Sequence, residues 1–121
     1  MSELTIKQFE FAIDLGRLLG YAAQACLDYK PGDALITVGD VFEDQQSIPS
    51  SHWIHMPGSL HSLRLAVDLN LIVDGELVTK EHGIWDKLGI FWKGVRIGNA
   101  WGGDFSSADY GHFSREHGGK K

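Results

Sequence analysis

The sequence predicts an α+β domain in which helices flank a small antiparallel sheet. Apolar residues recur at helical spacing near the N-terminus, apolar and polar residues alternate over 65–73, and a hairpin signal, Asp74-Gly75, follows that alternation. The 121 residues fit one domain, 1–121, which is long enough to form a hydrophobic core without disulfides.

A long helix, a strand and a long loop are predicted for the first half of the chain. Thr5 and Gln8 have the spacing of a capping box, and apolar residues then recur at helical spacing, so we expect a helix over about 6–28. The β-branched run at 34–38 predicts a strand. Residues 40–60 are rich in Gly, Pro, Ser, Asp and Gln without periodicity. They predict a long loop, and such loops in compact domains are usually functional or mobile.

The clearest strand is predicted at 65–73, and its two faces differ. Leucine and valine occupy the odd positions, whereas Asp68 and Asn70 occupy even positions and therefore face the other way. After the hairpin turn, 76–79 is expected to return as a second strand. Asp68 thus projects from a rigid element on the face opposite the leucine stripe. A rigid strand would hold a ligand side chain in a fixed position.

One more helix and one more strand are predicted for the C-terminal part. Apolar residues at helical spacing indicate a helix over about 81–93. The glycine-rich segment 101–105 is expected to form turns that lead into a last short strand near 111–114.

Composition excludes several functional classes. The net charge is -5 and the basic residues are scattered, so nothing resembles the electrostatic footprint of a nucleic-acid-binding protein. No apolar run approaches the roughly 20 residues that span a bilayer, and we find no signal peptide, so we expect the chain to begin in the cytoplasm. The single cysteine, Cys26, cannot form an internal disulfide, and its place in an apolar helical pattern predicts a buried, inert thiol.

Three side chains could form a metal site. The two imidazoles of His61 and His112 and the carboxylate of Asp68 can hold zinc by three bonds and leave a fourth position open for water, as in catalytic zinc sites. Asp109 precedes His112 by three residues, where a carboxylate could handle the protons of that water. His61 and Asp68 are seven residues apart, so one continuous strand would point them to opposite faces. They converge only if His61 lies in a turn before the strand; otherwise they are a solvated loop histidine and a strand aspartate.

A rival metal pair lies in the long loop. His52 and His55 have His-x-x-His spacing, but the sequence offers no second pair or cysteine set to complete a site around them. A solvated pair therefore stays the alternative to a second metal centre.

These motifs resemble a known family. Ser59-x-His61-x6-Asp68, followed by Asp109-x-x-His112, resembles the zinc peptidases of bacterial cell-wall peptides. That family includes D-alanyl-D-alanine carboxypeptidases and phage L-alanyl-D-glutamate endolysins. The resemblance covers roughly 35–117 and is strongest to small phage and prophage members.

The resemblance implies roles for individual residues. His61, Asp68 and His112 would bind Zn²⁺ on the sheet and the adjoining loops, and Asp109 would be the catalytic acid and base. Four further residues are expected to contact substrate or orient the ligands: Ser59, Arg64, Asn70 and Asp104.

The chain departs from the family at two positions. Many members have Gly where this chain has Arg64, although the small phage-type members share the Leu-Arg-Leu pattern. Many members carry an arginine after the first strand that helps to polarise the scissile carbonyl, and Glu43 stands at the matching position here. Arg64 or Arg96 could take over that role.

The activity that the resemblance implies is zinc-dependent hydrolysis of an amide bond in the peptidoglycan stem peptide, of L-Ala-D-Glu or D-Ala-D-Ala type, by a phage or prophage endolysin. We expect a monomer without a separate cell-wall-binding domain, held in the host cytoplasm until a holin gives it access to the periplasm and the wall. The alternatives are a non-catalytic zinc-binding structural or binding domain of a virion, and a zinc enzyme acting on a small amide or dipeptide.

Overall fold

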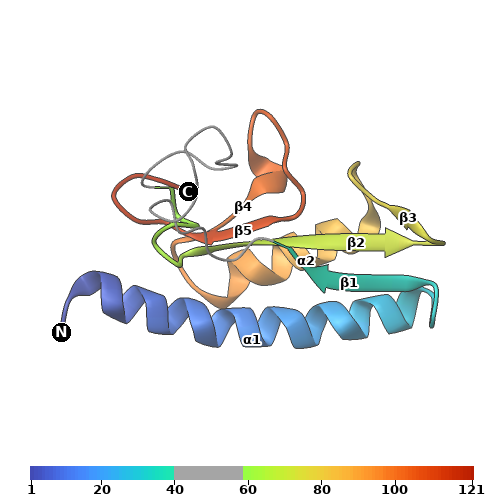
Figure 1. Ribbon diagram of the computed structural model, residues 1–121, viewed down its shortest axis with the longest axis horizontal. Helices are drawn as coiled ribbons and strands as arrows, with labels where there is room; N and C mark the ends of the chain where they lie inside the picture. The colour runs from blue at the N-terminus through green and yellow to red at the C-terminus, as the bar shows by residue number, and fades with distance from the viewer. Residues whose placement is uncertain (40–58) are drawn as a thin grey trace, which may run out of the picture.

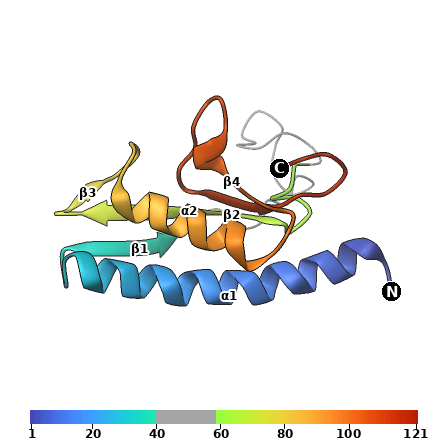
Figure 2. The ribbon, with the colours of Figure 1, turned by 180° about the vertical axis from the view of Figure 1, so that it is seen from behind.

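The computed structural model describes residues 1–39 and 59–121, which form helices packed on a small sheet. In chain order the elements are α1 (Glu3–Tyr29), β1 (Ala34–Val38), β2 (Ala66–Val73), β3 (Glu76–Leu77), α2 (Gly83–Val95), β4 (Asn99–Trp101), the 3-10 helix η2 (Gly102–Asp104) and β5 (His112–Arg115). Figure 1 shows α1 running along the length of the molecule beneath the sheet, and Figure 2 shows α2 beside it from behind. The predicted α+β class is confirmed. Neither described helix is both long and apolar enough to cross a membrane.

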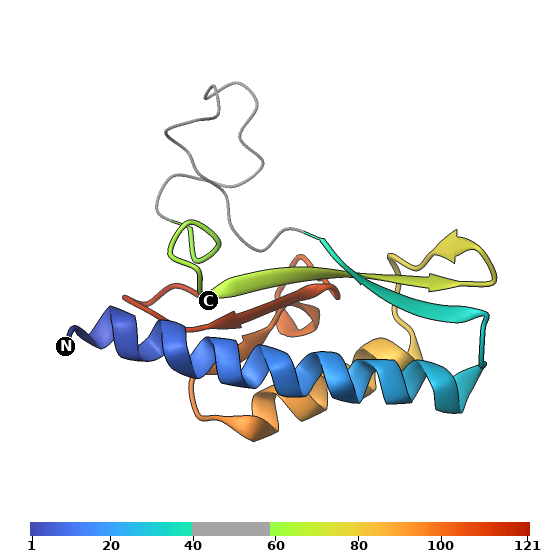
Figure 3. The same ribbon diagram turned by 60° about the horizontal axis from the view of Figure 1, so that its bottom comes forward.

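β2 is the strand on which the sheet is built. The order of the antiparallel strands is β1-β2-β5-β4, and β3 pairs with the end of β2. The first part of β2 pairs with β5, and the part from Leu69 to Val73 pairs with β1. Both helices lie on one side of this sheet, and the turn that precedes β2 lies on the other (Figure 3).

The start of α1 differs from the prediction. The helix begins at Glu3 because the Ser2 side chain caps it, accepting a hydrogen bond from the Thr5 backbone N–H at 3.1 Å. The predicted capping box of Thr5 and Gln8 is therefore wrong. The Gln8 amide instead donates to the Leu63 carbonyl at 2.9 Å, which ties α1 to the turn before β2.

Three boundaries in the second half also differ. The returning strand predicted at 76–79 ends after Leu77, and the helix predicted at 81–93 begins at Gly83. His82 is the N-cap of α2, because its Nδ1 accepts a hydrogen bond from the Ile84 N–H at 3.0 Å. β4 lies partly in the segment predicted as turns, and it forms by pairing with β5.

The core lies between the helices and the sheet. Trp92 and Phe113 are fully buried, and the edge of Trp92 meets both Phe113 and Phe11, with ring centroids 6.1 and 5.6 Å apart. Cys26 is buried as predicted, and burial raises the pKa of its thiol. Gly89 is required in α2 because a Cβ there would lie 2.2 Å from the Trp101 indole.

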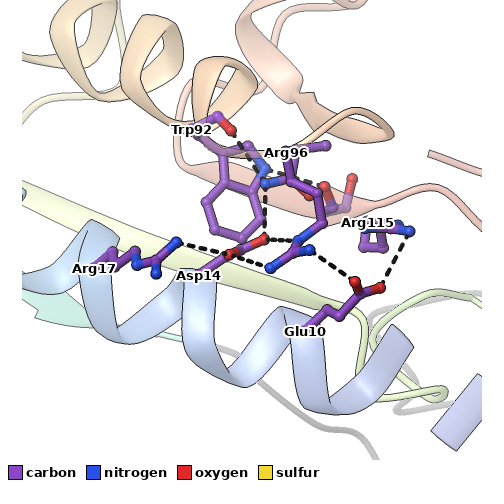
Figure 4. A network of polar contacts seen from close by, with 8 residues as sticks. Glu10, Asp14, Arg17, Trp92, Arg96 and Arg115 are labelled. Atoms are coloured by element: carbon purple, nitrogen blue, oxygen red, sulfur yellow. Dashed lines mark hydrogen bonds and ion pairs between the residues drawn. The ribbon is translucent and has the colours of Figure 1, made fainter. Parts of the chain in front are cut away.

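A charged network joins α1 to Arg96, at the end of α2, and to strands β4 and β5 (Figure 4). The Asp14 carboxylate is fully buried, and Arg96 donates to it from Nε at 2.7 Å and from Nη2 at 3.1 Å. Glu10 accepts from Arg96 Nη1 at 2.7 Å and lies 3.4 Å from Arg115 Nη2 in β5. Asn99 also donates to Asp14, at 3.3 Å. Because the buried charge has several donors, this network can fix the position of α1 on the sheet.

Removing the buried carboxylate should therefore destabilise the fold. We expect Asp14→Ala to lower the free energy of unfolding by about 3 kcal/mol, because Arg96 loses its bidentate partner. Arg17→Ala is the control: Arg17 reaches Asp14 only at 4.0 Å and is 59% exposed, so a loss below about 0.5 kcal/mol is expected. Urea unfolding followed by circular dichroism measures the free energy of unfolding of both variants. Equal losses would contradict the proposed contribution of the network to stability.

Candidate metal centre

His61, Asp68 and His112 converge at the start of β2. Each offers one ligand atom, and these atoms all lie within 4.8 Å of one another. Residues 60–64 form a turn, so the prediction that His61 lies before the strand is confirmed. Because the turn reverses the chain, the odd spacing of His61 and Asp68 does not separate them.

Short-range hydrogen bonds hold the turn that carries His61. The Leu65 N–H donates to the Leu60 carbonyl at 2.7 Å, and the Leu63 N–H donates to the Ser59 carbonyl at 3.2 Å. The Ser59 hydroxyl accepts from the Ser62 N–H at 3.4 Å, so Ser59 supports the turn from its first residue.

Arg64 and Gln8 complete the support of this turn. Arg64 closes it in the left-handed region, with φ of 59°. Gln8 of α1 also stabilises the turn, through its hydrogen bond to the Leu63 carbonyl. Sequence reasoning missed this role because the partner is 55 residues away.

Sheet register places the other two ligands. Asp68 and His112 are direct partners across β2 and β5, and side chains at such positions project from the same face within a few ångströms. The Leu69 N–H donates to the Gly111 carbonyl at 2.8 Å, which holds the end of the loop against β2.

The loop before His112 is closed by a glycine. The Asp109 N–H donates to the Gly102 carbonyl at 2.9 Å, and the Asp109 carbonyl accepts from the His112 N–H at 3.1 Å. A Cβ at position 102 would lie 2.1 Å from the Asp109 carbonyl oxygen, so only glycine allows this approach. Trp101 adds a bond from Nε1 to the Tyr110 carbonyl at 2.8 Å. The segment 101–105 therefore positions both Asp109 and His112.

The spacing of two of the three pairs of donor atoms matches that around a tetrahedral zinc ion. Asp68 Oδ1 lies 3.4 Å from His61 Nε2 and 3.4 Å from His112 Nδ1. These distances exceed the usual 2.7–3.2 Å of an N–H···O hydrogen bond. Bonds of about 2.0–2.1 Å at the tetrahedral angle separate two ligands by about 3.3–3.4 Å. Two imidazoles and a carboxylate are also donors that zinc takes in catalytic sites.

Electrostatics keep Asp68 in the form that binds a metal. Burial acts to raise the pKa of its carboxyl group, but the interactions with the nearby His112 and His61 side chains outweigh it and hold that pKa below its ordinary value. Asp68 is therefore ionised at neutral pH.

The remaining predicted residues lie in different places. Asp109 and Asn70 line a cleft of about 490 Å³ that Asp68 also lines. The Asp104 carboxylate forms an ion pair with Lys93 at 2.7 Å. Arg96, one candidate for the missing arginine, is engaged by Asp14 and Glu10. The other loop positions discussed above lie outside the described residues: Glu43, His52 and His55.

Comparison with known proteins identifies one family. The profile of the family described as D-alanyl-D-alanine carboxypeptidase matches residues 55–115, slightly more than half of the chain. The matched segment contains the three converging side chains and Asp109. No individual curated protein matches the sequence.

The bond from α1 to the ligand turn should affect metal affinity. We expect Gln8→Ala to weaken zinc binding about tenfold, the lower end of the usual effect of removing a group that orients a ligand, because the turn of His61 loses its outside support. Gln24→Ala is the matched control, since Gln24 lies on the same helix and bonds only to the nearby Asp28 at 2.8 Å among the contacts described. Competition with a chromogenic chelator measures both affinities, and equal values for the two variants would contradict this role of Gln8.

Proposed function

The chain belongs to the D-alanyl-D-alanine carboxypeptidase family, and from that premise we propose that it is a zinc metallopeptidase that hydrolyses an amide bond in the stem peptide of peptidoglycan. The observation that carries the proposal is the convergence of His61, Asp68 and His112 beside a cleft that Asp109 also lines. Three ligands leave a fourth position for water or for the scissile carbonyl.

The metal ion and the protein's residues have separate roles in the proposed reaction. When bound, zinc supplies a Lewis acid and a water molecule whose pKa is lowered to about 7. His61, His112 and Asp68 would hold the ion. Asp109 takes a proton from the attacking water and passes one to the nitrogen of the leaving amine. Positioned proton transfer of this kind typically contributes about 10²–10⁴-fold to the rate.

The finer assignment is a phage or prophage endolysin that cuts a bond of L-Ala-D-Glu or D-Ala-D-Ala type. What supports it is the resemblance of the motifs around His61, Asp68 and His112 to small phage-type members. We also propose that the protein acts as a monomer.

A second candidate is a non-catalytic zinc-binding domain of a virion. The observation that favours it is Glu43, a carboxylate at the position where many family members carry the arginine that polarises the carbonyl. The two candidates differ in one measurable property, since only the enzyme clears cell-wall suspensions.

Loss of Asp109 should separate metal binding from turnover. We expect the zinc-loaded protein to reduce the turbidity of outer-membrane-permeabilised cells and a chelator to abolish this. Asp109→Ala should keep its zinc yet lose at least about 100-fold in rate, because proton transfer is lost. His61→Ala should lose both zinc and activity. Asp28→Ala removes an exposed carboxylate at the end of α1 and should change neither. Hydrolysis by Asp109→Ala near the wild-type rate would show that the assigned role is wrong.

The lysis setting can be tested in cells. We propose that the protein stays in the host cytoplasm until a holin opens the membrane, which rests on the resemblance to phage endolysins. Expression alone should then leave cells intact, and co-expression with a holin should lyse them faster than the holin with the Asp109→Ala variant. Lysis at the same rate with both variants would contradict the proposal.

A further inference from the structure

Two segments of the chain border the cleft beside the candidate metal centre. One is 77–79, which runs from the end of β3, and the other is 108–111, which contains Asp109. The separation of these two segments sets the width of the cleft. It therefore sets the size of the group that can lie beside Asp109.

Backbone hydrogen bonds attach both segments to β2. The Gly111 carbonyl accepts from the Leu69 N–H at 2.8 Å. The Val78 N–H donates to the Leu71 carbonyl, also at 2.8 Å. Asn70 lies between these two points of attachment on β2 and lines the cleft. β2 is thus the common support of the two segments.

Trp85 connects the two segments from another side. Its indole Nε1–H donates to the Val78 carbonyl at 3.1 Å. The six-membered ring of the same indole lies beside Gly111, where an added Cβ would come 3.6 Å from Trp85 Cη2. The side chain is 2% exposed and belongs to the lining of the cleft. Because the indole is a rigid, planar group, it fixes the distance between Val78 and Gly111.

The helix and the core hold Trp85 itself in place. His82 is the N-cap of α2, and Trp85 lies in the first turn of that helix. The Phe113 ring of β5 packs against the indole, with ring centroids 6.3 Å apart. Val78 is bonded through both its N–H and its carbonyl, so the position of the indole determines the position of Val78.

We propose that Trp85 is a positioning residue for substrate binding, because it holds the segment 77–79 through Val78 at a set distance from 108–111. This inference rests on the proposed function. A wall of the cleft contacts a bound peptide equally before and during the reaction. Its displacement should therefore raise KM and leave kcat unchanged.

A variant that removes only the indole N–H and one ring tests the inference. Trp85→Phe keeps an aromatic side chain in the core but loses the hydrogen bond to Val78. We expect the zinc-loaded variant to show an apparent KM for soluble peptidoglycan fragments that is raised about fivefold, the effect of one lost hydrogen bond. Its kcat and its zinc content should equal those of the wild type.

Trp92→Phe is the matched control. Trp92 lies on the same helix, is fully buried, and also donates from Nε1 to a backbone carbonyl, that of Ser114, at 3.0 Å. It is not among the described residues that line the cleft. Its substitution should therefore leave KM unchanged. An equal rise of KM in both variants, or no rise in Trp85→Phe, would overturn the inference and leave the proposed function standing.

Hydrogen exchange gives a second test that does not depend on activity. The Val78 amide should exchange at least about fivefold faster in Trp85→Phe than in Trp92→Phe at the same pH, because one of the two bonds of Val78 is lost. Equal exchange rates in the two variants would overturn the inference. If the wild type cuts no peptidoglycan fragment, the proposed function fails and the role of Trp85 in substrate binding fails with it.

Discussion

The register between β2 and β5 is the constraint on which the site depends. It pairs Val67 with Phe113 and Asp68 with His112. Val67 and Phe113 are completely buried in the core, whereas Asp68 and His112 project from the opposite face toward His61. A slip of one residue would turn the polar pair into the core and expose the apolar pair. The burial of two hydrophobic side chains therefore sets the geometry of two candidate metal ligands.

The third ligand depends on the helix layer. His61 lies in a turn outside the sheet, and Gln8 of α1 bonds to that turn at the Leu63 carbonyl. The position of α1 is in turn set by the buried Asp14 and its bonds to Arg96. Glu10 extends the same network to Arg115 in β5, the strand that begins with His112. One network thus orders α1 against β5, whose first residue is the candidate ligand His112, and α1 orders the turn that carries the candidate ligand His61.

Local patterns in the sequence predicted more of the fold than of the candidate site. The alternation over 65–73 predicted β2 and the face of Asp68, because strand periodicity is a property of neighbouring residues. β4 could not be predicted, since it is short and exists by pairing with β5. Asp14 lies among apolar residues of α1, and its partner Arg96 is 82 residues away in the sequence. The convergence of the ligands could be predicted only conditionally, because it depends on a turn and on a register between distant strands.

Burial decides on which side the candidate metal centre is accessible. The side chains of His61 and His112 are 3% and 10% exposed, whereas the Asp68 carboxylate is 26% exposed. The candidate ligand set is therefore most exposed at Asp68, which also lines the cleft. Asp109 lies on the wall of the same cleft, so the side from which a peptide enters is also the side on which a proton acceptor is available. Among the residues that the structure describes, two buried imidazoles and one accessible carboxylate thus leave the centre most exposed on the side of Asp68, where the cleft lies.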